Sequence, residues 1–197
     1  MKIIILLGVH GSGKGEQMSL LAKEGIVEDV LSTGEAYRNV FNPKSRYYKY
    51  RNTYGKYVAR GWSEKGKYPP DGEVIAMVKD LLEIEKKKGY KVIGMEGYPR
   101  RIGQAQALLK MCKEIGDIQI QCIYLDLSDE EGLKRILHRD TYDKHGESLE
   151  ANKKRIALYH RVTDRAIDFL RSKGLVTDVN DNPPIKKVHD LIVKALA

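Results

Sequence analysis

The chain has 197 residues, 42% of them hydrophobic and 31% charged, which is typical of one globular domain with a sizeable core. Its formal net charge of +8 indicates an anionic partner, either a phosphorylated small molecule or nucleic acid. Cys112 and Cys122 have neither metal-ligand nor disulfide-framework spacing, which excludes a disulfide-rich secreted domain and favours a cytoplasmic location. No apolar stretch approaches the roughly 20 residues that span a bilayer, and the apolar run 3–9 is brief for a signal peptide.

A glycine-rich stretch follows the first apolar run. Residues 3–7 are predicted to form a buried strand because isoleucine is β-branched and no polar residue interrupts them. Residues 8–17 read Gly-Val-His-Gly-Ser-Gly-Lys-Gly-Glu-Gln, and a helix is expected over residues 15–23. Such a turn presents backbone N–H groups at a helix N-terminus, where an anion is favoured. The spacing of Gly8 and the Gly13-Lys14 pair predicts a phosphate-binding loop, because a turn without a ligand rarely needs four glycines and a lysine.

The segment 37–68 differs in character from the rest of the chain. Before it, a strand is expected at residues 27–31, and Ser32 is expected to begin a helix. The segment holds nine lysines and arginines, one acidic residue and seven of the chain's twelve tyrosines. We predict a basic insertion, helical in two pieces broken at Asn42-Pro43, that forms a mobile flap rather than part of the core. Its aromatic and cationic side chains leave open a nucleic-acid-binding function.

Strands and helices alternate in the remainder. In chain order we expect a helix at 72–88, a strand at 91–95, a helix at 104–115, a strand at 119–127, a helix capped by Ser128, a long helix at 147–173, a strand at 175–179 and a final helix with Pro184 as its first residue. The long helix presents an apolar face that consists of Ile156, Tyr159, Thr163, Ala166 and Leu170. The alternation predicts an α/β fold, a five-stranded parallel sheet covered by helices on both faces.

Four motifs occur in a fixed order along the chain. They are the loop 8–17, Ser32-Thr33-Gly34-Glu35 with Arg38, Lys65-Gly66-Lys67-Tyr68-Pro69-Pro70-Asp71, and Glu96-Gly97-Tyr98-Pro99-Arg100-Arg101 with Gln104. The last one follows a predicted strand, so it should face the phosphate loop at the carboxyl edge of the sheet. In this order they resemble the motifs of the adenylate kinases, within the nucleoside monophosphate kinases. The resemblance runs nearly end to end and includes Gly15, where most phosphate loops carry Ser or Thr.

The resemblance implies a single P-loop kinase domain over residues 1–197, with a three-layer α/β/α core. A flap at about 32–70 would bind the nucleoside monophosphate, and about 140–150 would form a short lid. The implied activity is reversible transfer of the γ-phosphoryl group from MgATP to AMP, giving two ADP. Alternatives are a nucleotide-binding protein of this fold with weak catalysis, or a kinase for another nucleoside monophosphate. The resemblance disfavours nucleic acid as a partner, the lack of a long apolar stretch disfavours a membrane, and we expect a monomer.

The resemblance also assigns roles to residues. The ATP-binding set would be Gly11, Ser12, Gly13, Lys14, Gly15, Glu16 and Arg135. The AMP-binding set would be Thr33, Gly34, Arg38, Lys67, Tyr68, Pro69, Gly97, Tyr98, Arg100 and Gln104. The catalytic set would be Lys14, Arg100, Arg139 and Arg155. No general base is needed, because the attacking phosphate oxygen is already ionised at neutral pH.

Three features depart from the family pattern. Glu96 replaces an aspartate that orients Mg²⁺ through water, and the change keeps the charge. The short lid lacks an arginine, and without a cysteine cluster we expect no zinc there. Glu16 replaces a threonine beside the γ-phosphate, where two unit charges about 4 Å apart repel by about 4 kcal/mol at an effective dielectric near 20. Glu16 therefore either ligates the metal or points away toward a basic partner.

Overall fold

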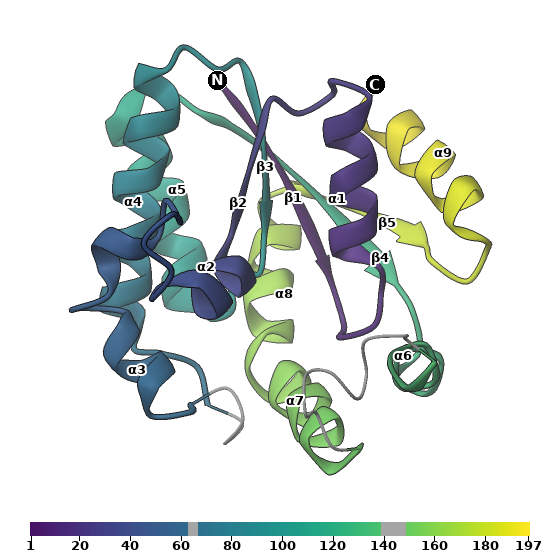
Figure 1. Cartoon of the computed structure of the whole chain (residues 1–197). Coiled ribbons are helices and arrows are strands. Elements are labelled where there is room, and N and C mark those ends of the chain that lie inside the picture. The colour runs from purple at the N-terminus through teal and green to yellow at the C-terminus, as the bar shows by residue number, and fades with distance from the viewer. Residues whose placement is uncertain (63–66, 139–148) are drawn as a thin grey trace.

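The computed structural model describes residues 1–62, 67–138 and 149–197. A five-stranded sheet forms its centre, with the strand order β2-β3-β1-β4-β5 and every pairing parallel, as the sequence predicts (Figure 1). The strands are β1 (Lys2–Gly8), β2 (Asp29–Ser32), β3 (Val92–Glu96), β4 (Gln119–Asp126) and β5 (Val176–Asn180). Nothing in the described ranges forms a helix with the length and apolarity that crossing a membrane requires.

Helices cover both faces of the sheet. They are α1 (Lys14–Lys23), α2 (Thr33–Asn39), α3 (Gly55–Ala59), α4 (Asp71–Lys87), α5 (Ile102–Gly116), α6 (Asp129–Leu137), α7 (Leu149–Val162), α8 (Asp164–Ser172) and α9 (Ile185–Leu196), with a 3-10 turn η1 (Tyr48–Tyr50). Side chains alternate along β1, so Ile3 and Ile5 pack with α4, α5 and α8, whereas Ile4 and Leu6 pack with α1 and α9. This confirms a three-layer α/β/α core.

The two predicted serine caps are confirmed, whereas other helix starts differ from the prediction by one or two residues: α1 begins at Lys14, α4 at Asp71 and α5 at Ile102. Ser32 Oγ accepts a hydrogen bond from the Glu35 N–H at 3.1 Å, and Ser128 Oγ accepts one from the Glu131 N–H at 3.3 Å. Pro184 is the N-cap of α9 and not its first residue, since its ψ of 150° is extended. The helical conformation therefore begins only at Ile185.

The predicted long helix 147–173 is divided into α7 and α8. Thr163 separates them, although its own N–H still donates to the Tyr159 carbonyl at 2.6 Å. Because the interruption spans one residue with near-helical dihedral angles, the two helices keep a common apolar face. All five residues predicted for that face are buried: Ile156, Tyr159, Thr163, Ala166 and Leu170.

Part of the basic segment packs in the hydrophobic core, which corrects the expectation that the whole segment lies outside the core. Tyr47, Tyr50 and Tyr54 are buried in the same cluster as the α4 side chains. The tyrosines can be buried because their hydroxyls find partners: Tyr47 Oη accepts from the Ser32 N–H at 3.1 Å, for example. Within the described part of the segment the helical pieces are α2, η1 and α3, three rather than two, with the expected Asn42-Pro43 break after α2.

An ion-pair cluster also anchors this segment. Arg46 contacts Asp29 at the edge strand β2 at 2.7 Å and pairs with the fully buried Glu85 of α4. Burial raises the pKa of Glu85, while Lys88 and Arg46 lower it. The segment is therefore fixed to both the sheet and α4 at this point.

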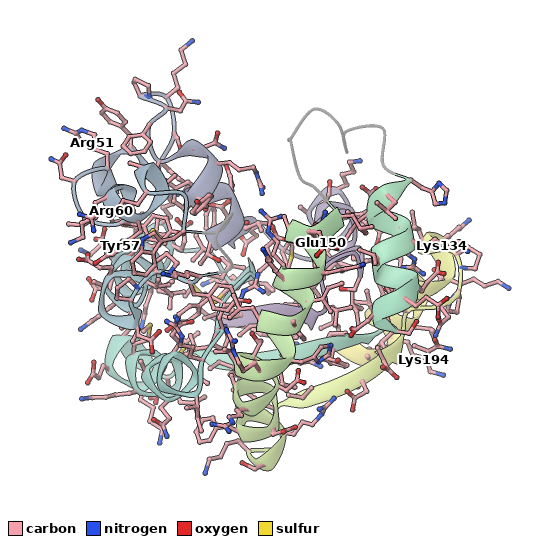
Figure 2. The ribbon with its side chains drawn as sticks, turned by 90° about the horizontal axis from the view of Figure 1, so that it is seen from below. Arg51, Tyr57, Arg60, Lys134, Glu150 and Lys194 are labelled. Atoms are coloured by element: carbon pink, nitrogen blue, oxygen red, sulfur yellow. The ribbon has the colours of Figure 1, made fainter. Side chains whose placement is uncertain are left out.

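The carboxyl ends of the strands all face one side of the molecule. Seen from that side (Figure 2), the segment with Arg51, Tyr57 and Arg60 lies on one flank and α6 with Lys134 lies on the other. The start of α7, with Glu150, lies between them. Ligands of open parallel sheets bind outside the carboxyl ends of strands, so this face is where the site is expected.

Candidate active site

The phosphate loop turns between β1 and α1, and its lysine folds back over it. The Lys14 ammonium donates hydrogen bonds to the carbonyl oxygens of Gly8 at 2.9 Å and Val9 at 2.7 Å, and to Ser12 Oγ at 3.0 Å. Gly13 is the N-cap of α1. Backbone N–H groups at the start of α1 therefore lie near a positive side chain, which is the arrangement that an anion site requires.

Gly11 holds the loop against α6. Its φ is +95°, and a Cβ at this position would lie 2.2 Å from the carbonyl oxygen of Gly132. A Cβ on Gly132 would in turn lie 2.7 Å from the carbonyl oxygen of His10. The two glycines thus permit backbone to pack on backbone. Sequence reasoning missed Gly132, because a single glycine after a helix cap carries no signal of a distant contact.

Arg135 of α6 is fixed by Asp181, which follows β5. Its Nη1 donates to Asp181 Oδ2 at 3.0 Å, its Nη2 to the Asp181 backbone oxygen at 2.7 Å, and its Nε to Glu131 Oε1 at 3.3 Å. Only one of these bonds reaches the Asp181 carboxylate, so burial outweighs the attraction of Arg135 and Lys14 and raises the pKa of Asp181 to about 6. Sequence reasoning missed Asp181 as well.

We expect the Asp181→Asn substitution to remove one source of pH-dependent stability. The folded pKa of about 6 lies above the ordinary value of 3.8, so the folded protein holds this proton more tightly than the unfolded chain. The contribution of Asp181 to the free energy of unfolding therefore falls as pH rises through this interval. Between about pH 4 and about pH 7, the stability of the variant should rise relative to wild type by about 1 to 3 kcal/mol in urea titrations. A constant difference over this range would contradict the assignment.

Glu96 ends β3 beside the phosphate loop. Its Oε1 accepts a hydrogen bond from Ser32 Oγ at 2.7 Å, which fixes the carboxylate. Its Oε2 lies 3.6 Å from where a Cβ on Gly15 would be. The predicted approach of this motif to the loop is thus confirmed, and Ser32 is a supporting residue that sequence reasoning assigned only as a helix cap.

Glu16 lies on the first turn of α1 with its side chain exposed. In this position a carboxylate interacts favourably with the helix dipole. No basic side chain within the described ranges forms an ion pair with it. The hypothesis that Glu16 turns toward a basic partner therefore finds no such partner there.

Arg100 lies in the turn that follows β3, and its guanidinium has N–H donors that the described residues do not use. Its Nε donates to the Gly97 carbonyl oxygen at 2.9 Å, which also accepts from Thr33 Oγ1 at 2.8 Å. Gly97 has a φ of +76°, and a Cβ there would lie 2.4 Å from Thr33 Oγ1. Among the residues that the structure describes, the two terminal nitrogens of Arg100 make no hydrogen bond. A guanidinium in this state can bind a phosphate through two parallel bonds.

Gln104 is buried, and both ends of its amide are in use. Its Oε1 accepts from the Arg100 backbone N–H at 2.8 Å, and its Nε2 donates to Asp71 Oδ1 at 2.8 Å. Arg101 donates to the same Asp71 oxygen at 2.9 Å and to the Pro69 carbonyl oxygen at 3.1 Å. Each end of the amide keeps one further hydrogen-bonding position, because the nitrogen has a second N–H and the oxygen a second lone pair.

The other predicted acceptor residues surround this corner. Arg38 is exposed at the end of α2, and its Nη1 lies 3.4 Å from where a Cβ on Gly34 would be. The guanidinium groups of Arg100 and Arg101 lie 5.4 and 5.7 Å from the centroid of the Tyr68 ring. Lys67 is exposed beside Trp62, and Tyr98 is buried with its hydroxyl donating to the Gln104 carbonyl oxygen at 3.0 Å.

A small cleft lies between the loop and the Arg100 corner. Lys14 at the start of α1 and Arg100 in the turn after β3 both line it, although 86 positions separate them in the chain, from 14 to 100. Tyr159 and Thr163 of the α7–α8 face complete its wall. Two cationic groups facing one cleft can hold two phosphate chains close together, with water displaced between them.

Three predicted features lie wholly or partly outside the described residues. They are Arg139, the lid at 140–150 except its last two positions, which begin α7, and Lys65-Gly66 of the third motif. Arg155 is described: it lies half-buried on α7, one turn before Tyr159.

Nucleophilic thiol chemistry does not fit the site. Cys112 and Cys122 are both buried away from the cleft, and burial raises the pKa of each to about 12. Such thiols stay protonated at neutral pH. Within ranges 1–62, 67–138 and 149–197, no group of three His, Cys, Asp or Glu side chains could hold a metal ion by itself. The cleft is instead suited to binding and orienting phosphates.

Comparison with known proteins agrees with this geometry. The family model described as adenylate kinase matches residues 6–175. The chain is 30% identical to an adenylate kinase of Parabacteroides distasonis over 195 residues, which cover 98% of this chain and 96% of that protein. It is 28% identical to an adenylate kinase of Leptospira biflexa over 198 residues, the full length of both. It is also 30% identical to adenylate kinase isoenzyme 1 of Cyprinus carpio over 200 residues, covering 99% and 94%.

Proposed function

The chain belongs to the adenylate kinase family of nucleoside monophosphate kinases, and we propose that it transfers the γ-phosphoryl group of MgATP reversibly to AMP, giving two ADP. The observation that carries this proposal is the cleft that Lys14 and Arg100 share. In-line transfer between two phosphates requires cationic donors on both sides of the transferring group, and the two residues come from different segments, the start of α1 and the turn after β3.

The donor would bind at the phosphate loop. We propose contacts from Gly11 to Glu16 to the phosphates, and from Arg135 to the base. Lys14 would exchange its bonds to loop carbonyls for bonds to phosphate oxygens. This exchange keeps the ammonium hydrogen-bonded in both states, so binding leaves no buried charge without a partner.

The acceptor would bind on the side of the basic segment, which we propose as the flap 32–70. Arg38 and Arg100 would hold its phosphate. Thr33 and Gln104 would contact adenine, and an amide suits that base because it offers a donor and an acceptor together. Gly34, Lys67, Tyr68, Pro69, Gly97 and Tyr98 would form the remaining wall. Arg139 and Arg155, with the proposed lid 140–150, would complete the charge on the transferring group.

The residues present fit a magnesium ion that arrives with ATP. Glu96 offers one carboxylate oxygen next to the start of α1, and hard oxygen ligands are those that Mg²⁺ prefers. When bound, the ion would neutralise charge on the β- and γ-phosphates. Glu16 could supply a second oxygen from the same helix turn, and we propose that it does.

The Glu16→Thr variant tests this role. If Glu16 ligates the metal, turnover should fall about tenfold, and the Mg²⁺ concentration that gives half-maximal rate should rise. A matched control is Glu130→Thr, because Glu130 also lies exposed on the first turn of a helix, α6. Unchanged turnover and unchanged Mg²⁺ dependence would contradict a metal role. A gain of about tenfold or more would instead identify plain repulsion of the nucleotide.

The proposed reaction is tested by measuring ADP formation from MgATP with AMP, CMP, UMP and GMP in turn. We expect AMP to give the highest kcat/KM. A higher value with a pyrimidine nucleotide would contradict the acceptor assignment. Rates at background with all four would favour the alternative of a nucleotide-binding protein with weak catalysis, for which Glu16 is the specific motivation.

The remaining proposals concern the oligomeric state, the location and the ligands of the protein. We propose a monomeric protein of the reducing cytoplasm that acts on ATP, AMP and ADP. Nucleic-acid binding through the basic segment is less well supported, because Tyr47, Tyr50 and Tyr54 are buried and cannot stack on bases.

A further inference from the structure

Two hydroxyl groups in the cleft donate no hydrogen bond within the described part of the chain. They are Tyr159 Oη and Thr163 Oγ1. The side chains are nearly inaccessible, since Tyr159 is 3% exposed and Thr163 is 1% exposed. Both residues line the same cleft as Lys14 and Arg100. Buried hydroxyls are seldom left without a partner, so a molecule that occupies the cleft is the natural candidate to complete them.

Local structure does not use these hydroxyls. Thr163 is the N-cap of α8, where a threonine side chain usually accepts a hydrogen bond from the backbone. Here no such bond forms, and the N–H groups of Ala166 and Ile167 donate to the Thr163 carbonyl oxygen at 2.9 and 3.1 Å instead. Tyr159 lies one helical turn earlier, so the two hydroxyls belong to one face.

The surroundings select an anionic oxygen as the missing partner. Lys14 and Arg100 make the cleft positive, and both hydroxyls can donate a hydrogen bond. Burial raises the pKa of Tyr159, so its phenol stays protonated and remains a donor. Neutral donors add hydrogen bonds to a phosphate without adding further charge, which complements the cations already present.

We propose that Tyr159 and Thr163 are substrate ligands, whose hydroxyls donate hydrogen bonds to phosphate oxygens of the nucleotide held between Lys14 and Arg100. This inference rests on the proposed function, because it takes that cleft as the place where the phosphates meet. The α7–α8 face would then contribute two uncharged phosphate donors.

The test uses Tyr159→Phe and Thr163→Val, which remove a hydroxyl with little change of volume. Calorimetric titration with ADP should show binding weakened about fivefold or more in each variant, and kcat with MgATP and AMP should fall about tenfold. The melting temperature should stay the same or rise, since each variant loses a buried hydroxyl that donates no hydrogen bond within the described residues of the empty protein. Tyr90→Phe and Thr177→Val are matched controls outside the cleft and should change none of these quantities.

Three outcomes would decide the matter. ADP affinity and kcat within about twofold of wild type would show that water alone completes the hydroxyls, which overturns the proposal. Lost activity together with a melting temperature lowered by several degrees would identify a structural role, which also overturns it. If wild type fails to phosphorylate AMP yet the variants bind ADP more weakly, the ligand role stands while the proposed reaction fails.

Discussion

The Arg100→Lys variant is expected to lose about a hundredfold to a thousandfold in kcat with MgATP and AMP. Lysine keeps the positive charge but replaces a planar fork of donors with a single ammonium. In the structure the Nε of Arg100 donates to the Gly97 carbonyl, which fixes a guanidinium that lines the cleft. Lysine can reproduce only one of these two functions at a time. The measurement is steady-state kinetics at saturating MgATP over a range of AMP concentrations.

The neighbouring residue provides the control for this prediction. Arg101 bonds to Asp71 and to the Pro69 carbonyl, so its guanidinium is used within the protein. Arg101→Lys should therefore lower stability slightly and change kcat by less than about fivefold. If Arg100→Lys retained a third or more of the wild-type kcat, Arg100 would not be the group that orients the acceptor phosphate.

The Gly11→Ala variant is expected to be the most damaging single methyl addition in the phosphate loop. The new Cβ would lie 2.2 Å from the Gly132 carbonyl oxygen, and backbone on both sides prevents easy relief. The positive φ of Gly11 adds about 1 to 2 kcal/mol of strain for any residue with a Cβ. Together these effects should lower the free energy of unfolding by about 3 kcal/mol or more, which corresponds to about 6 to 12 °C in Tm for a chain of this length.

Alanine variants of two other glycines separate the backbone strain of a positive φ from the steric clash of a new Cβ. Gly13, with a φ of +67°, and Gly25, with a φ of +71°, both have open space around the position of a Cβ. Alanine at either position should therefore cost only the strain of about 1 to 2 kcal/mol. Differential scanning calorimetry of the three variants decides the point. Equal losses for Gly11→Ala and Gly25→Ala would show that the loop does not pack on α6 in this way.

Some features of this protein were readable from short stretches of sequence. The strand of β1 follows from five uninterrupted apolar residues, and the loop after it follows from the spacing of its glycines and Lys14. The caps at Ser32 and Ser128 were predicted from a serine that is followed three residues later by a glutamate, and each serine hydroxyl accepts a hydrogen bond from the N–H of that glutamate. These predictions succeeded because each depends on interactions between residues that are close in the chain.

The basic segment shows where local reading failed. Its charge and tyrosine content suggested a flap outside the core, yet Tyr47 and Tyr50 are buried against the sheet and α4. The composition of a segment reports its average polarity, but burial depends on which side chains meet a distant surface. A tyrosine can take either place, because it has an apolar ring and a polar end.

The sequence by itself determined the alternation of strands and helices, the phosphate loop and the order of the motifs, because periodicity and turn chemistry act over a few residues. Only the tertiary structure decided that the Gly11 backbone packs on Gly132, that Arg135 donates to Asp181, and that Ser32 donates to Glu96. It alone brought the hydroxyls of Tyr159 and Thr163 beside Lys14 and Arg100. These partners are far apart in the chain, and parallel strands with crossover helices bring them together at one edge of the sheet, which no local pattern encodes.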